Sequence, residues 1–515
     1  MSNLSGSNNG ERSHGEIMVV MSALMLAMLL AALDQTIVST ALPKIASDLH
    51  GLNKYSWVAT AYLLTSAVST PLYGKISDMY GRKKIFQSAI IIFLVGSALC
   101  GLSQNMTQLI FFRGLQGIGA GGLMTLVLAI VGDVIPPRQR GRYQGYFGGV
   151  FAIASVIGPL LGGLLTDHLS WRWVFYVNLP IGVIALAAIA TRLHLPVRRT
   201  EHKVDYAGAG LLALSVVSLL LATVWGGVDY PWGSVQVIGL FVTSLVAAGL
   251  FIVREHYAKE PIIPMRLFRN EIFSVSVLLS LLVGVVMFGA IIFIPEYQQL
   301  VRGDSATKSG LMLLPLVLGV VGGSLTSGRL ISKWGRYRIF PIAGTLLLII
   351  SFFLFSHIAI ATNRVVIGGW MVILGLGVGM VMPVMTLAVQ NGVERKDLGT
   401  ATSSVTFFRS IGSSLGAAIF GAILINRLSV HLQQALPGST GTSVAKSLGS
   451  SATGLQHLPP AEVHVILTAF AQAFADVFLI GIPFAVGAFI VTFFLKESPL
   501  STSTREQAET DLGGI

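Results

Sequence analysis

Long apolar runs separated by short polar segments dominate the chain. About fourteen such runs follow one another, each of about 20 residues, which is the length that an α-helix needs to cross the hydrocarbon of a membrane. They start near residues 17, 55, 84, 108, 142, 174, 205, 234, 272, 306, 338, 365, 398 and 464. The pattern predicts an all-α membrane protein with fourteen transmembrane helices.

Composition agrees with this interpretation. Of the 515 residues, 53% are hydrophobic and 11% are charged, whereas soluble domains carry about 25% charged residues. The single cysteine, Cys100, lies inside an apolar run, so no disulfide can form within the chain. The first helix is expected to remain uncleaved, because its apolar run is longer than the core of a signal peptide.

The basic residues indicate an orientation. An even number of crossings puts both termini on one side of the membrane, and basic residues are enriched in cytoplasmic loops. Placing the termini inside puts roughly 24 of the 34 Lys and Arg residues in the cytoplasm and roughly 8 outside. We therefore expect a plasma-membrane protein with cytoplasmic termini. The net charge of +11 is then explained by topology and by contact with anionic lipid headgroups, not by nucleic acid.

Three sequence patterns occur twice in the same order. The stretch from Gly74 to Arg82 matches the stretch from Gly328 to Arg336, the glycines at 117–121 match those at 375–379, and the start of the fifth run matches 398–399. The repeat predicts two six-helix halves, with the runs near 205 and 234 as a linker. The expected domains are a tail 1–16, a first bundle 17–194, linker helices with their loops 195–256, a second bundle 257–496 with a long outer loop 426–463, and a tail 497–515.

Several quoted motifs carry a family resemblance. "YGKISDMYGRKKIF" (73–86) resembles the loop signature of major facilitator transporters. "LDQTIVSTALPKIASDL" (33–49) and "WRWVFYVNLPIG" (171–182) are similar to signatures of the fourteen-helix drug:proton antiporters, the multidrug exporters of the quaternary-ammonium-compound type. The resemblance implies the major facilitator fold, with two six-helix bundles and two linker helices.

The loop at 73–86 is the first candidate site. Its glycines allow helices to approach closely, and Asp78 can accept hydrogen bonds from Arg82. The resemblance implies a third member, Asp133, and we expect a polar latch that is closed when the binding cavity faces outward. The alternative is a basic loop that only sets topology, with a solvated aspartate. The candidate gating residues are Gly74, Asp78, Gly81, Arg82, Lys83 and Asp133.

Charged residues inside the spans form the second candidate site. Each costs roughly 2.5–3.5 kcal/mol on insertion scales, so it needs a partner or a use. Asp34 is the first choice for a proton site, and the resemblance gives Arg113 a role in holding or releasing it. Glu296, which follows Pro295, is a second candidate proton or cation site. The alternatives are a capped or paired Asp34, an Arg113 bound to backbone carbonyls, and a wet Glu296 at the outer rim.

The segment "IGPLLGG" (157–163) resembles the antiporter motif of helix 5, with Ala154 where the family usually has glycine. The resemblance places its kink at the interface of the two halves, as a pivot and a seal against leak. Ordinary packing glycines are the alternative. The residues concerned are Gly158, Pro159, Gly162 and Gly163.

The functional prediction is export of lipophilic, cationic compounds in exchange for protons. The chain has no phosphate-binding G-x-x-x-x-G-K-[ST] loop and no histidine pair with metal-ligand spacing, so we expect no cofactor, no metal and a proton gradient as the energy source. The alternatives are export of an endogenous lipid, siderophore or metabolite, and a membrane-embedded enzyme or lipid scaffold. We expect a monomer and not an enzyme. Candidate substrate contacts, which could equally be packing or lipid-facing residues, are Gln116, Met287, Phe288 and Met382.

Overall fold

The computed structural model describes residues 14–50, 54–193, 204–227, 229–304, 306–435 and 460–500. The first half of the chain forms α1 (His14–Asp48), α2 (Tyr55–Tyr80), α3 (Arg82–Leu102), α4 (Met106–Val134), α5 (Pro137–His168), α6 (Trp173–Tyr176) and α7 (Asn178–Arg192). The middle forms α8 (Tyr206–Trp225) and α9 (Val235–Tyr257). The second half forms η2 (Met265–Arg269), α10 (Glu271–Leu300), α11 (Ala306–Leu311), α12 (Leu314–Trp334), α13 (Ile339–Phe355), α14 (Arg364–Gly392), η3 (Arg395–Asp397), α15 (Leu398–Ala435) and α17 (Pro460–Thr492).

The helices confirm the predicted crossings. Among the described residues, twelve helical segments are long and apolar enough to span a membrane. The more polar α2 and the shorter α13 complete the fourteen runs seen in the sequence. The sixth crossing is broken between α6 and α7, and the tenth between α11 and α12. The chain is therefore a multi-pass membrane protein.

Local chemistry sets where several helices begin. At five helix starts the preceding polar side chain accepts a hydrogen bond from a free backbone N–H of the first turn, which is the usual role of an N-cap. These residues are Asn105, Asp205, Ser234, Asn270 and Asn363. Because each lies at the edge of an apolar run, polarity and helix boundary coincide.

Gly81 and Gly335 occupy equivalent positions of the repeat, and both have a left-handed backbone. Gly81 separates α2 from α3 with φ 93°, and Gly335 ends α12 with φ 72°. Residues with a Cβ rarely adopt this region. The role of Gly81 is therefore to turn the chain between two helices, and the close approach expected from the sequence is made at Gly74.

One boundary of the predicted domains is wrong. The outer loop expected from residue 426 begins later, because α15 continues to Ala435. Its last turns are held by Arg427 and His431, which contact the Asp476 carboxylate of α17 at 2.6 and 2.8 Å. Polar residues that indicate a loop are here the exposed end of a helix. Residues 436–459 of that predicted loop lie outside the described residues.

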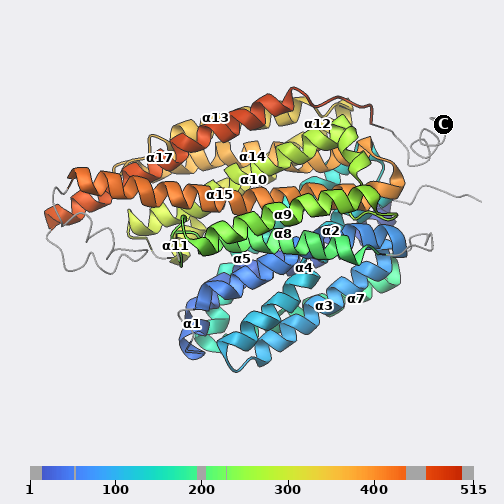
Figure 1. The fold of residues 1–515 in the computed structure, drawn as a ribbon, viewed down its shortest axis with the longest axis horizontal. Helices are drawn as coiled ribbons and strands as arrows, with labels where there is room; N and C mark the ends of the chain where they lie inside the picture. The colour runs from blue at the N-terminus through green and yellow to red at the C-terminus, as the bar shows by residue number, and fades with distance from the viewer. Residues whose placement is uncertain are drawn as a thin grey trace, which may run out of the picture.

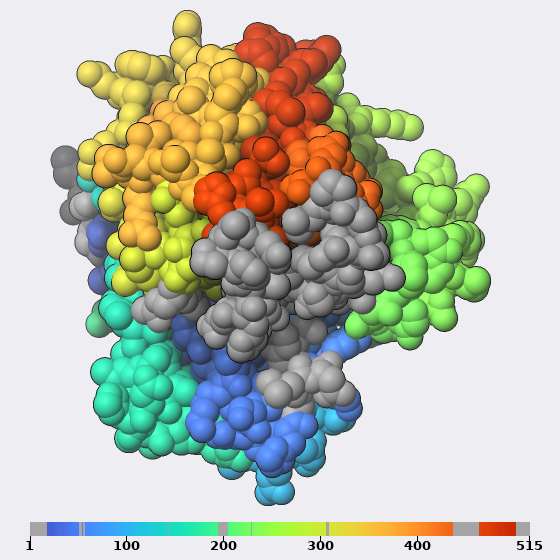
Figure 2. Space-filling view, turned by 90° about the vertical axis from the view of Figure 1, so that its left-hand side faces the viewer, coloured from blue at the N-terminus to red at the C-terminus, as the bar shows by residue number. Residues whose placement is uncertain are grey.

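The two halves of the chain have separate apolar cores. One core is formed by the helices after residue 266, and two adjoining cores are formed by helices before residue 194. Figure 1 shows the first half, blue to teal, below the second half, yellow to red. In Figure 2 the first half again lies below the second half, and the green linker helices lie at one side. The domain boundaries at 194 and 257 stay predictions.

The linker helices bridge the two halves. Leu212 of α8 and Phe251 of α9 share an apolar cluster with Leu64 of α2 and Phe407 of α15. An ion pair of 2.7 Å between Lys75 of α2 and Glu260, just after α9, adds a polar anchor. The linker therefore packs against both halves instead of lying apart from them.

The halves meet through two equivalent glycine crossings. A Cβ on Gly74 of α2 would collide with the backbone carbonyl of Gly399 on α15, and a Cβ on Gly328 of α12 would collide with that of Gly141 on α5. Gly74 and Gly328 are repeat partners, as are Gly141 and Gly399. The sequence repeat thus becomes a pair of symmetry-related contacts, in which small residues allow backbones to touch.

Substituting valine at either crossing should therefore destabilise the protein. We expect Gly328→Val to lower the free energy of unfolding by about 1–3 kcal/mol, because the added methyl groups overpack a backbone contact. The matched control is Gly210→Val on α8, where a Cβ would meet nothing within 4 Å. Thermal denaturation in detergent measures both, and equal midpoints for the two variants would contradict the crossing.

Candidate functional site

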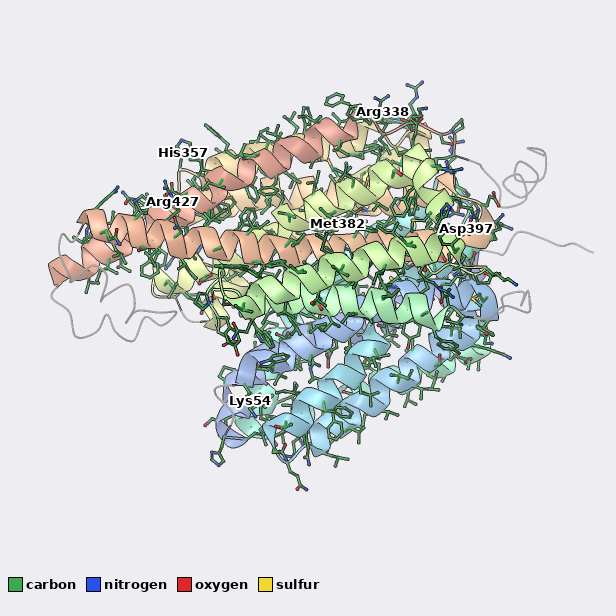
Figure 3. All side chains as sticks on the ribbon, in the orientation of Figure 1. Lys54, Arg338, His357, Met382, Asp397 and Arg427 are labelled. Atoms are coloured by element: carbon green, nitrogen blue, oxygen red, sulfur yellow. The ribbon has the colours of Figure 1, made fainter. Side chains whose placement is uncertain are left out.

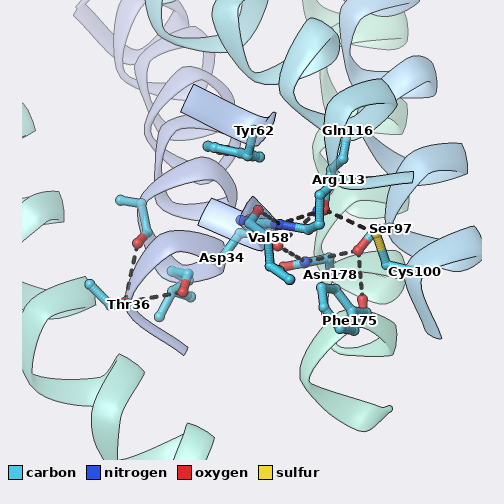
Figure 4. Close-up of polar contacts among 12 residues, drawn as sticks. Asp34, Thr36, Val58, Tyr62, Ser97, Cys100, Arg113, Gln116, Phe175 and Asn178 are labelled. Atoms are coloured by element: carbon cyan, nitrogen blue, oxygen red, sulfur yellow. Dashed lines mark hydrogen bonds and ion pairs between the residues drawn. The ribbon is translucent and has the colours of Figure 1, made fainter. Parts of the chain in front are cut away.

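Asp34 lies at the centre of a buried polar cluster. Its carboxylate accepts from Arg113 Nη1 at 2.6 Å, from Gln116 Nε2 at 2.8 Å and from Asn178 Nδ2 at 2.9 Å. The Asp34 side chain is 0% exposed and that of Arg113 is 3% exposed. Figure 4 shows these side chains converging from three helices, α1, α4 and α7. Three N–H donors satisfy the ionised form of the carboxylate.

The guanidinium of Arg113 is held on several sides. Nη1 also donates to Gln116 Oε1 at 2.8 Å, and Nε donates to the Val58 carbonyl of α2 at 3.4 Å. The ring of Tyr62 lies 4.2 Å from the guanidinium carbon, within the range of a cation–π contact. The ring of Phe175 lies 5.9 Å from the same carbon. The positive charge is thus balanced by one carboxylate and two aromatic faces.

The break between α6 and α7 positions Asn178. Ser97 of α3 donates to the Phe175 carbonyl at 2.8 Å, where α6 ends, and accepts from Asn178 Nδ2 at 3.0 Å. Asn178 is the first residue of α7. Its Oδ1 is buried and has no hydrogen-bond partner among the described residues. The break between the two helices therefore places the Asn178 amide beside Asp34. The Oδ1 acceptor of that amide stays unused.

Sequence reasoning found part of this cluster. The structure brings Asp34 and Arg113 together, as the resemblance suggested. Sequence reasoning missed Asn178 and Tyr62, although an asparagine inside an apolar run was a usable signal. Gln116, a predicted substrate contact, belongs to the cluster: its amide donates to Asp34 and accepts from Arg113 and Cys100. Glu296 lies on α10 in the other half, partly buried, and is not part of the cluster.

The predicted latch residues also come together. Arg82 Nη1 lies 2.7 Å from the Asp78 carboxylate, and Arg82 Nε lies 2.7 Å from that of Asp133 at the end of α4. Asp78 further accepts from the backbone N–H groups of Gly399 and Thr400 at the start of α15, at 3.2 and 2.8 Å. The free N–H groups of a helix N-terminus suit a carboxylate. Asp78 therefore joins the first half to the second.

Further hydrogen bonds join the halves at this same end. Arg138 of α5 donates to the carbonyl of Ser332 on α12, and Gln390 of α14 donates to the carbonyl of Leu128 on α4. Lys83, by contrast, donates to the Ala190 carbonyl of α7 within the first half. It was predicted to belong to the latch and lies outside it, because its side chain points to its own bundle.

The glycines of the helix 5 motif contact α1. A Cβ on Gly158 would collide with Thr36 of α1, and one on Gly162 would collide with Thr40 and with the Ile37 carbonyl. These contacts lie within the first half, whereas α5 also packs against α12 of the second half, and the pivot role stays a prediction. Gly163 would meet nothing within 4 Å, and Pro159 is partly buried inside α5. The motif packs α5 on α1.

A small pocket lies between α10, α14 and α15. It contains Met382 and Met385, the Arg409 guanidinium and the Ser280 hydroxyl, with valines completing the wall. Met382 is the one predicted substrate residue that lines it. Met287 packs against the core of the second half, and Phe288 is partly buried outside the pocket. Among the described residues, no cluster of His, Cys, Asp or Glu could hold a metal ion.

The comparisons with known proteins agree with this architecture. The family model described as "Major Facilitator Superfamily" matches residues 24–417. An uncharacterised MFS-type transporter of Mycobacterium tuberculosis is 42% identical over 96% of this chain and 71% of its own length. The multidrug transporter protein MdtP of Bacillus subtilis is 39% identical over 98% of this chain and 97% of its own.

Solved structures show the same fold. The proton:xylose symporter XylE superposes with a TM-score of 0.61 at 13% identity, covering 97% of this chain and 100% of its own. The human organic anion transporter MFSD10 gives a TM-score of 0.60 at 16% identity, covering 91% and 99%. The family model that matches most of the chain and the relatives at 42% and 39% identity show the family. The chain belongs to the major facilitator superfamily, and it is a transporter and not an enzyme.

Proposed function

We propose that this transporter exports lipophilic compounds, cationic ones among them, from the cell in exchange for protons. The observation that carries the proposal is the fully buried Asp34 carboxylate, held by Arg113, Gln116 and Asn178. Related proteins of Bacillus subtilis named as multidrug transporters support the drug-export part. The proposed location is the plasma membrane, with both termini in the cytoplasm.

The proton would act at Asp34. Protonation removes the charge that balances Arg113 and turns one carboxylate oxygen into a donor. That donor needs an acceptor, and Asn178 Oδ1 is the buried acceptor without a partner. Rotation of the Asn178 amide would present Oδ1 to the protonated acid, whereas Nδ2 serves the ionised form. Asn178 can therefore satisfy both protonation states, and Arg113 is free to shift when Asp34 becomes neutral.

The helix α4 connects this site to the latch. It carries Arg113 and Gln116 near its outer end and Asp133 at its inner end, about 30 Å away at 1.5 Å per residue. A shift of α4 that follows release of Arg113 would move Asp133 relative to Arg82. The latch holds the halves together at the end assigned to the cytoplasm, so the described state is the outward-facing one in this scheme.

The energy would come from the proton gradient. Each proton that moves inward gains about 2.3 kcal/mol per 100 mV, in addition to the pH difference. Met382 and Met385 line the small cavity beside Arg409, and methionine side chains adapt to ligands of varied shape. Alternating access then requires only that the latch at one end and the contacts at the other open in turn.

Asp34→Asn should abolish uphill export. An amide cannot exchange a proton at physiological pH, and it leaves the Arg113 charge without its partner, a loss of about 3–5 kcal/mol for a buried pair. In everted vesicles with an imposed pH gradient, uptake of a lipophilic cationic dye should fall to background. Exchange of dye at equal concentrations on both sides should persist, because it needs no proton.

The control on the same helix is Asp48→Asn, where the carboxylate is exposed and pairs with Lys44. Its export rate should stay within about twofold of the wild type, since an exposed pair is worth at most about 1 kcal/mol. If Asp34→Asn exported the dye uphill at the native rate, Asp34 would not be the proton site. Export of a lipid or metabolite, with no response to any cationic dye, would move the assignment to an endogenous cargo.

The latch gives a second comparison. Arg82→Gln removes two ion pairs and should reduce export at least about tenfold with normal membrane insertion, because the buried Asp78 then lacks its charged partner. Lys83→Gln removes the same charge from the next residue, where the side chain contacts a backbone carbonyl of its own half. It should export at close to the native rate. Equal losses in both variants would indicate a topogenic loop instead of a latch.

A further inference from the structure

Arg409 is a cation in the middle of the second half without a matching acid. It lies on α15, eleven residues after the start of the helix at Leu398, or about 16 Å along its axis. In the part of the chain that the structure describes, it forms no ion pair. Its one hydrogen bond goes to the Met382 sulfur, with Nη1 and Sδ 3.6 Å apart. A thioether is a weak acceptor, whereas a guanidinium has five donors.

The position of Arg409 is fixed by its backbone. A Cβ on Gly284 of α10 would collide with the Arg409 carbonyl, so the two helices touch at this level. Ser413, one turn on, donates to that same carbonyl at 2.9 Å. The guanidinium is therefore presented from a rigid helix crossing and not from a loop.

Arg409 faces a small cavity among core residues of the second half. The cavity between α10, α14 and α15 has a volume of about 10 Å³, which is room for about one water molecule. It therefore has space for one small polar group, such as a carboxylate oxygen, beside the guanidinium. Its walls are valines and the methionines Met382 and Met385, so the guanidinium is the strong donor in a largely apolar space. Figure 3 places Met382 near the middle of the molecule's long axis.

The helix that carries Arg409 also contacts the other half. α15 packs against α10 and α14 within its own half and against α2 of the other half. A ligand bound between the halves would therefore lie beside the helix that presents Arg409. By contrast, Arg113, a buried arginine on α4 of the first half, is already paired with Asp34. The two halves differ in this respect: one supplies its own counter-charge and the other does not.

We propose that Arg409 binds an anionic group of the exported molecule, so that the substrates include amphiphiles with a carboxylate, above all zwitterions. The ligand supplies the missing charge, and its apolar body lies between the halves. A planar guanidinium matches a carboxylate with two parallel hydrogen bonds. This inference deepens the proposed export function and rests on it only for the direction of transport, since binding needs no proton gradient.

A matched pair of dyes tests the inference. Rhodamine B carries a free carboxylate, and its ethyl ester has the same cationic ring system without that charge. Fluorescence anisotropy with the purified full-length protein in detergent measures the affinity for each. We expect Arg409→Gln to weaken binding of rhodamine B about tenfold or more, while the ester changes by less than about twofold. Arg409→Lys should recover part of the lost affinity, because it keeps the charge but not the planar fork.

Two controls separate this role from a structural one. Arg427→Gln removes a positive charge from the outer end of the same helix, where Asp476 is its partner, and should leave both affinities unchanged. Free acetate should compete with rhodamine B in the wild type if both use the Arg409 site. Equal losses for acid and ester in Arg409→Gln, or an unchanged affinity for rhodamine B, would overturn the proposal.

The outcome is separable from that of the export proposal. Rhodamine B binding that depends on Arg409, together with no uphill movement of either dye, would contradict proton-coupled export and leave the binding site standing. Uphill export of the ester, together with an unchanged affinity of Arg409→Gln for rhodamine B, would support proton-coupled export and contradict the Arg409 binding site.

Discussion

Two opposite charges, 2.6 Å apart and almost without solvent exposure, join α1 to α4 in the first half of this protein. Each of Asp34 and Arg113 would be costly to bury without the other, so α1 and α4 stay in a fixed relation while the pair exists. Buried ion pairs add little stability compared with well-packed apolar side chains of the same size. The pair is better explained by use than by stability, and a carboxylate whose loss of charge releases a neighbour is a natural input for a switch.

The second half repeats the scaffold and changes the charges. Gly328 copies the helix contact of Gly74, and Gly335 shares the positive φ of Gly81. The acid does not repeat, since Ser332 stands at the position of Asp78. Likewise, no carboxylate among the described residues pairs with Arg409 in the way that Asp34 pairs with Arg113. In our scheme the first half handles the proton and the latch, and the second half handles the charge of the cargo.

The contacts between the halves suit a joint that must open. The glycine crossings bring backbones into van der Waals contact, and at Gly74 the small Ser403 side chain packs there as well. The polar contacts at the same end are made to helix termini and backbone carbonyls. In our scheme these groups exchange their partners for water when the halves separate, so that opening leaves no buried group unsatisfied.

The sequence by itself determined the helices and the family. Fourteen apolar runs and polar caps are set by local hydrophobicity and by bilayer thickness, so they are visible without a fold. The repeat indicated two related halves, and the family resemblance grouped Asp78, Arg82 and Asp133, which the structure brings together. Tertiary structure alone decided which side of each helix faces which neighbour. It placed Gly158 and Gly162 against α1, and it placed Gln116 and Asn178 beside the Asp34 carboxylate. These outcomes depend on helix rotation and on contacts between distant segments, which the length and polarity of a single run do not encode.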